Sequence, residues 1–205
     1  LSILLITHKL YEVLNMSDRV TVLRKGKLIA TVNTSETNRH DLACMMVGRE
    51  VNFKVDKEPL PPGDTLLRIE DLHLVRENGV PALDGFSLTV CGSQILGLAG
   101  VAGNGQKELY DVIVGVQNPS RGKILLEGKD ITGRTPLEIN HQGLAGIPPD
   151  RINEGLIMDF SVKENLILGM HHSKSFQKYG LFNPGAVDRF ADQSVKGFDI
   201  ALQSA

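Results

Sequence analysis

The sequence predicts an α/β fold with an antiparallel β portion, and three patterns carry that prediction. Continuous apolar runs at 2–7 (SILLIT) and 93–100 (SQILGLAG) are typical of strands buried on both faces of a sheet. Segments with apolar residues at helical spacing follow each run. Between the runs, LLRIEDLHLV and ALDGFSLTV each read as a strand, and we expect these two strands to pair.

Composition is that of a soluble globular protein. Its 205 residues are 41% hydrophobic and 22% charged, and the net charge of −2 gives no basic field that would favour nucleic acid. No apolar run approaches the roughly 20 residues that span a bilayer. Cys44 and Cys91 fit neither a disulfide framework nor a metal-ligand spacing, so we expect two buried small residues in a reducing compartment.

The first fifty residues predict three further elements after the opening strand. Apolar spacing predicts a helix within 9–17, and two β-rich runs joined at Lys25–Gly26 predict a hairpin. A second helix is expected within 37–48, with Gly48 just past its end. Because the chain opens on Leu inside an apolar run, the sequence suggests a fragment of a longer protein.

A charged stretch with three prolines, REVNFKVDKEPLPPGD, separates these elements from the rest and reads as a linker. Beyond it, the two expected strands are followed by the apolar run at 93–100 and a glycine-rich turn. The remaining expected elements are a helix in QKELYDVIVGV ending near Gly115, a strand–turn–strand in GKILLEGKDI, a helix from Pro136, a short strand in GLAGI, an irregular loop in PPDRINEG, and a helix with a capping box at Ser161 and Glu164.

The glycine-rich turn resembles a phosphate-binding loop with altered side chains. Gly100 and Gly105 fit the two glycines of the G-x-x-x-x-G-K-[ST] pattern, and Gly103 lies between them. Gln106 stands where the pattern has its lysine, and Lys107 stands where it has the hydroxyl that holds Mg²⁺. Backbone amides can still grip a phosphate, but a neutral Gln stabilises no transferring phosphoryl group, and a Lys repels Mg²⁺.

Two other interpretations of this turn stay open on the residues alone. It is compatible with a strand-to-helix turn that binds no ligand. It also has part of the dinucleotide pattern, with Glu127 about 20 positions further on as the ribose contact, although Glu108 stands where the third glycine belongs. That interpretation would make the ligand NAD.

Two long stretches resemble one protein family. The first, ILLITHKLYEVLNMSDRVTVLRKGKLIATVNTSETNRHDLACMMVGRE, is similar to the end of the first nucleotide-binding domain of tandem-domain ABC importer ATPases of the simple-sugar and nucleoside type. The second contains ALDGFSLTV, GLAGVAGNGQKEL, SRGKILLEGKDI, GIPPDR and EGLIMDFSVKENLIL, and is similar to the start of the second domain. The resemblance implies a P-loop NTPase-like (ABC ATPase) fold, with 1–50 in the first domain, 51–64 as linker and 65–205 in the second.

The resemblance also implies site residues. His8, in ITHK, matches the switch histidine that contacts the γ-phosphate. The region IPPDRINEGLIMDFSVKENL matches the Q-loop, but Pro149 stands where the family has a Gln or an acidic residue, so metal sensing would fall to Asp150 if to any side chain. VRENG lacks the aromatic residue expected to stack on adenine. The residues that match the second Walker A loop are Gly100, Gly103, Asn104, Gly105, Gln106 and Lys107.

The function that the resemblance implies is ATP hydrolysis coupled to uptake of a simple sugar or nucleoside. Its cofactors would be ATP and Mg²⁺, and its partners a transmembrane permease subunit and, indirectly, a solute-binding protein, at the cytoplasmic face of the membrane. The signature and Walker B motifs are expected outside these 205 residues, so we expect the chain to be inactive alone. The alternative is a non-catalytic docking module with a vestigial nucleotide loop.

Overall fold

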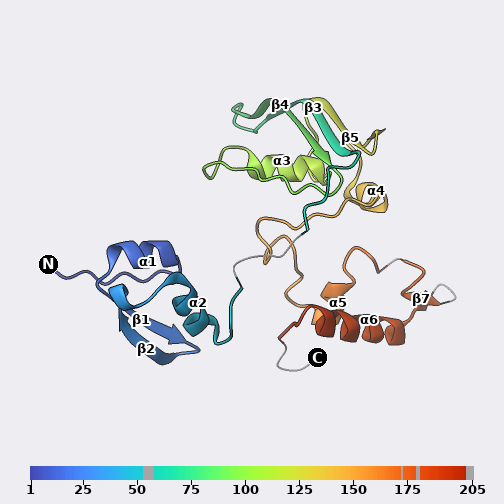
Figure 1. Cartoon of the computed structure of the whole chain (residues 1–205). Coiled ribbons are helices and arrows are strands. Elements are labelled where there is room, and N and C mark those ends of the chain that lie inside the picture. The colour runs from blue at the N-terminus through green and yellow to red at the C-terminus, as the bar shows by residue number, and fades with distance from the viewer. Residues whose placement is uncertain (53–57, 172, 179–180, 202–205) are drawn as a thin grey trace. The chain divides into compact units, whose positions relative to one another are not determined.

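A computed structural model of the chain describes residues 1–52, 58–171, 173–178 and 181–201. The structure combines helices with antiparallel sheets, so the predicted mixed α/β class is confirmed (Figure 1). The chain divides into two units, Leu1–Pro59 and Leu60–Ala205. Within the described residues, no helix is long and apolar enough to cross a membrane.

The first unit is a β-hairpin flanked by two α-helices, and its local signals act as predicted. Lys25 and Gly26 both have positive φ, 50° and 74°, as the tight hairpin turn between two right-twisted strands requires. Gly48, with φ of 84°, ends the second helix in the left-handed conformation. The elements are α1 (Leu10–Met16), β1 (Arg19–Arg24), β2 (Lys27–Asn33), the short 3₁₀ turn η1 (Thr34–Glu36) and α2 (Arg39–Val47).

An antiparallel sheet forms the body of the second unit. Its strands are β3 (Thr65–Val75), β4 (Pro81–Cys91), β5 (Arg121–Leu126) and β6 (Lys129–Asp130), in the order β4-β3-β5-β6. The predicted pairing of LLRIEDLHLV with ALDGFSLTV is confirmed, with Ile69 opposite Leu88 and Leu72 opposite Phe86.

Helix α3 (Gln106–Ile113) covers one face of this sheet (Figure 1). Gly115, with φ of 79°, follows its end as predicted. Helix α4 (Pro136–His141) closes the same core and begins with a capping box between Thr135 and Glu138. The buried core comprises Ile69, Leu72, Leu74, Leu83, Leu109, Val112, Ile124, Ile131 and Ile139.

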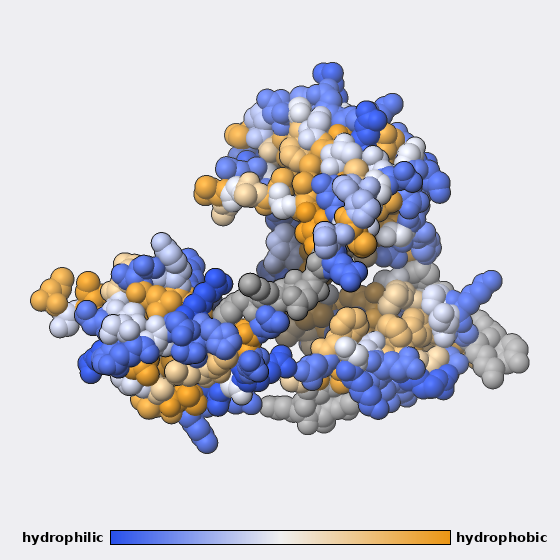
Figure 2. All heavy atoms as spheres, viewed as in Figure 1, coloured by the Kyte–Doolittle hydropathy of each residue, from blue (hydrophilic) through white to orange (hydrophobic). Residues whose placement is uncertain are grey.

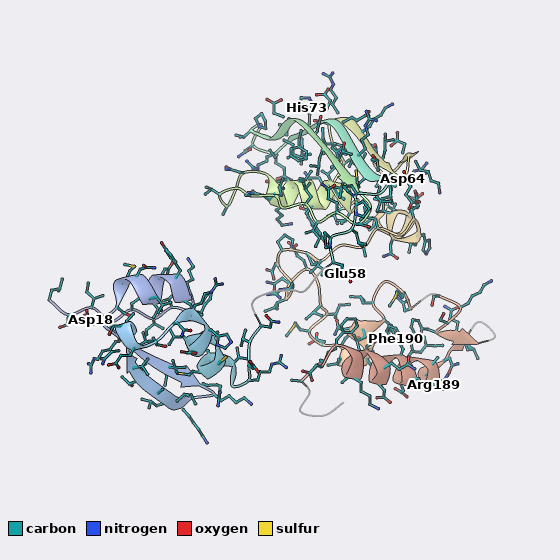
Figure 3. The ribbon with its side chains drawn as sticks, viewed as in Figure 1. Asp18, Glu58, Asp64, His73, Arg189 and Phe190 are labelled. Atoms are coloured by element: carbon teal, nitrogen blue, oxygen red, sulfur yellow. The ribbon has the colours of Figure 1, made fainter. Side chains whose placement is uncertain are left out.

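The other face of the sheet is polar. His73, labelled in Figure 3, alternates along β3 with the buried Leu72 and Leu74, and therefore points away from the core. Its ring nitrogens lie 3.0 Å from a carboxylate oxygen of Asp71 and 3.1 Å from one of Asp84. These contacts tie β3 to β4 on the solvent side.

The last part of the chain forms a small second core. The predicted capping box of Ser161 and Glu164 is confirmed and begins α5 (Val162–Leu166). Helix α6 (Pro184–Gly197) was not predicted, although Asn183 followed by Pro184 is a typical helix start. Two-residue strands β7 (Gln177–Lys178) and β8 (Leu181–Phe182) precede α6. The core consists of Ile167, Phe176 and Val187, with Phe190 packed against it.

Three predicted strands are wrong. The apolar runs at 2–7, 93–100 and 143–147 have no strand conformation, and Ile3, Ile95 and Ile147 are each 80–84% exposed. A strand needs a neighbouring backbone to bond, and in the part of the chain that the structure describes no strand pairs with these runs. Figure 2 shows the first run as an orange cluster at the N-terminus.

The burial of the two cysteines differs from the expectation. Cys44 and Cys91 are both free thiols, and both are half-buried rather than buried. Cys91 is the last residue of β4, and Cys44 lies on α2.

Candidate functional site

The glycine loop, residues 100–105, leads directly into α3. Gly103 and Gly105 have φ of 92° and 96°, a conformation that L side chains rarely adopt. Gly105 is the N-cap of α3 and offers no side-chain acceptor to the N–H groups of the first helical turn. Those N–H groups and the positive end of the helix are the features by which such a loop binds an anion.

The two glycines serve different purposes. A Cβ on Gly103 would meet no heavy atom within 4 Å, so this glycine is required only by its backbone angle. A Cβ on Gly105 would fall within 3.0 Å of the Ala82 carbonyl oxygen and 3.2 Å from Leu83 Cδ2. The loop therefore lies against the first residues of β4, and this close approach fixes its position on the sheet.

The side chain of Gln106 turns back over the loop. Its Nε2 donates to the carbonyl oxygen of Val101 at 3.2 Å, and it also packs against Gly100, where a Cβ would collide with it. The residue at the usual lysine position therefore closes the loop on itself as a neutral hydrogen-bond donor.

The ammonium of Lys107 points along α3, away from the loop. Its Nζ lies 2.9 Å from Asp111 Oδ2, one turn further along the helix, and 3.1 Å from Glu154 Oε1. Hydrogen bonds to Asp111 and then to Glu154 raise the pKa of Lys107 above its usual value, so the group stays charged. In this structure its charge is therefore paired with two carboxylates.

Arg76 holds the glycine loop from the far end of β3, and sequence analysis missed this role. Its Nε donates to Glu108 Oε1 at 2.7 Å, and its Nη2 donates to the Gly103 carbonyl oxygen at 2.9 Å. The Arg76 guanidinium is the largest cause of a lowered pKa of Glu108. The only signal in the sequence was a cation at a hairpin end and a carboxylate in the first turn of a helix.

The other predicted site residues lie elsewhere. His8 is exposed and precedes α1 in the first unit, where it follows the apolar run at 2–7. Its contact with a γ-phosphate stays a prediction, as do the roles of Gly100, Gly103, Asn104, Gly105, Gln106 and Lys107.

Asp150 organises a turn. One of its oxygens accepts from the backbone N–H groups of Ile152 and Asn153, at 3.1 and 3.0 Å, and the other accepts from the Asn153 amide at 2.7 Å. These hydrogen bonds, that of the Asn153 side chain first, lower the pKa of Asp150. Over the described residues, no group of three or more His, Cys, Asp or Glu side chains could hold a metal ion.

A hollow of about 550 Å³ lies apart from the glycine loop. It lies between the end of α4 and α6, and its lining includes Asn140, Phe176, Arg189 and Phe190. Phe176 and Phe190 stack edge to face with ring centroids 5.3 Å apart, and Figure 3 labels Phe190 and Arg189 on α6. No residue of the glycine loop lines this hollow.

Several curated proteins are similar to the chain over most of its length, whereas no family model matches it. The nucleoside import ATP-binding protein NupA of Lactococcus lactis subsp. cremoris is 38% identical over 199 residues, which is 97% of this chain and 39% of that protein. The glucose import ATP-binding protein TsgD13 of Haloferax volcanii is 41% identical over 97% of this chain and 36% of its own length. The guanosine import ATP-binding protein NupO of Bacillus subtilis is 40% identical over 89% of this chain and 36% of its own length.

Solved structures match a smaller part. CbiO1 from Clostridium perfringens, part of an ABC transporter complex, covers 67% of this chain and 51% of its own, with 23% identity and a TM-score of 0.49. The chain spans 36–39% of the length of the three curated relatives described above. Over nearly its whole length, the chain is thus a sequence relative of the import ATP-binding proteins of ABC transporters, as its motifs predicted.

Proposed function

We propose that the chain is part of the ATP-binding subunit of an ABC importer that couples ATP binding and hydrolysis to uptake of a simple sugar or nucleoside. The observation that carries the proposal is the 38% identity, over 97% of the chain, to a protein named for nucleoside import and ATP binding. In this proposal residues 1–50 end one nucleotide-binding domain, 51–64 link it to the next, and 65–205 begin the second. The partners are a permease subunit at the cytoplasmic face of the membrane and, indirectly, a solute-binding protein.

The glycine loop is the proposed nucleotide contact of the second unit. Backbone N–H groups around Gly103, Asn104 and Gly105 would hold phosphate oxygens at the start of α3, where no N-cap side chain competes for them. Gln106 would add a neutral donor once it leaves the Val101 carbonyl. The residues here do not fit Mg²⁺, because Lys107 replaces the hydroxyl ligand.

We expect the 205-residue chain to bind nucleotide without turning it over. The loop offers amides, but neutral Gln106 stands where the usual lysine would reach the transferring phosphoryl group. Phosphate release by the purified chain with Mg-ATP tests this expectation. Turnover that exceeds that of a His8→Ala variant would contradict it.

Calorimetric titration with ATP and ADP tests binding itself. We expect a dissociation constant of about 1 mM or tighter, equivalent to roughly −4 kcal/mol. Gly105→Asp should abolish binding, and because that variant can also disturb the contact with Ala82, its circular dichroism must match the parent protein. Gln106→Lys restores the usual cation without replacing a glycine, and should tighten ATP binding about tenfold.

A second candidate function is a non-catalytic docking module whose glycine loop no longer binds nucleotide. The observation that favours it is that Gln106 and Lys107 are both engaged with protein atoms, at 3.2 Å and at 2.9–3.1 Å. This function predicts no heat of binding for the parent chain and none for Gln106→Lys. Nucleotide binding by either protein rejects the docking module. It is supported if both proteins are well folded and neither shows a heat of binding. A response to NAD that depends on Glu127 would favour the dinucleotide interpretation instead.

A further inference from the structure

The ion pairs of Lys107 join two segments that lie far apart in the sequence. Asp111 belongs to the same helix as Lys107, and its carboxylate is only 14% exposed. Glu154 belongs to the turn at 150–155 and is 36% exposed. Lys107 therefore ties the start of α3 to that turn through one exposed carboxylate.

The turn that carries Glu154 is well defined. Asp150 accepts from two backbone N–H groups within it, and the Glu154 N–H donates to the Asp150 carbonyl oxygen at 3.0 Å. A Cβ on Gly155 would meet the Arg151 carbonyl oxygen at 2.8 Å and Pro148 Cγ at 3.1 Å, which indicates a tightly wound backbone. The carboxylate of Glu154 is thus presented to Lys107 by an ordered turn rather than by a loose tail.

Lys107 is the second residue of α3, so its stem begins at the helix end where an anion would bind. The four-carbon stem lets the ammonium swing from Asp111, one turn along the helix, back to the loop. The group is charged in this structure, since hydrogen bonds to Asp111 and then to Glu154 raise the pKa of Lys107. The ammonium of Lys107 can therefore pair either with the carboxylate of Glu154 or with a phosphate in the loop, but not with both at once.

We propose that Glu154 competes with bound polyphosphate for Lys107, so that filling the glycine loop releases the turn at 150–155 from α3. The inference rests on the proposed nucleotide site and adds a regulating residue to it. Asp111 lies on the same helix as Lys107 and stays in place when the ammonium leaves it, whereas Glu154 and its turn are then no longer tied to α3. Because the turn continues to α5 through 156–161, loop occupancy would be transmitted to the segment that follows.

The test is a double-mutant cycle on the full 205-residue chain, titrated calorimetrically with ATP and with inorganic tripolyphosphate. Glu154→Gln should tighten binding of both ligands roughly two- to fivefold, the range expected from releasing one exposed ion pair. In a Lys107→Gln background the same change should have no effect. Asp188→Asn is the matched control, because it breaks a similar exposed pair, 2.9 Å from Lys163, on α6.

Hydrogen exchange gives a second measurement. ATP should speed exchange of the amides at 152–155 in the parent chain, and these amides should already exchange faster in Glu154→Gln. The inference is overturned if the parent chain binds and Glu154→Gln binds no tighter, or if tightening persists without Lys107, because Glu154 would then act through its own charge. Absence of binding in every variant, Gln106→Lys included, refutes the proposed function and the inference with it.

Discussion

Replacing Gly105 by Ala is the change that most directly tests how the glycine loop is held. A non-glycine residue in the left-handed conformation costs about 1–2 kcal/mol, and φ at this position is 96°. The added methyl group must also displace the Ala82 carbonyl oxygen, which lies within 3.0 Å of its position. Overpacking of that kind typically costs about 1–3 kcal/mol more. We expect a total loss of about 2–5 kcal/mol in the stability of the second unit.

Gly103→Ala is the matched comparison, because φ there is 92° and no atom lies within 4 Å of the new methyl group. It should cost only about 1–2 kcal/mol, from backbone strain alone. Urea-dependent hydrogen exchange of the amides of β4 and α3 reports the stability of this unit separately from the first. Equal losses for the two variants would show that the loop is not packed against β4, and would refute the reasoning.

Three further changes test other parts of the second unit. Leu72→Ala removes a side chain with 0% exposure, and should cost about 2–5 kcal/mol in urea unfolding; a loss below 1 kcal/mol would contradict its place in the core. Glu108→Gln removes the ion pair with Arg76. The pKa of Glu108 in the folded protein lies below its ordinary value of 4.5, so between these two values the unfolded state binds more protons. The stability that this variant loses should therefore be greatest above pH 4.5 and should shrink as the pH falls through the lowered pKa. A stability loss that is constant from pH 7 to pH 3 would exclude the pair. Ser161→Ala removes the cap of α5 and should speed exchange of its first-turn amides, equivalent to about 1 kcal/mol, whereas unchanged exchange would exclude the capping box.

The sequence predicted best the features that a few adjacent residues determine. The turn at Lys25–Gly26, the helix end at Gly48 and the capping box at Ser161 each depend on residues at most three positions apart. Local sterics and local hydrogen bonds determine where a positive φ or a capping hydroxyl occurs. The residues that form the sequence pattern are therefore the same residues that interact in the structure.

Strands require more than their own residues. The run SILLIT has the composition of a buried strand, but hydrogen bonds from another segment make a strand, and composition does not supply that segment. Where the partner lies within the described chain, as for β3 and β4, the alternating pattern led to the right pairing.

The candidate site shows the same division. Gly103, Gly105 and Gln106 were recognisable because they are neighbours in the sequence. Arg76 and Glu154, which reach the loop and Lys107 from 27 and 47 positions away, were not. No short pattern contains both members of such a pair, so their contacts emerge only once the sheet and the turn are folded.

The three exposed apolar runs have a consequence for handling the protein. Their exposed side chains, on backbone that pairs with none of the described strands, offer ready templates for intermolecular β-pairing. Turbidity of a concentrated solution should therefore rise with protein concentration and with sulfate, which strengthens apolar association, and fall when Ile3 and Ile95 are replaced by lysine.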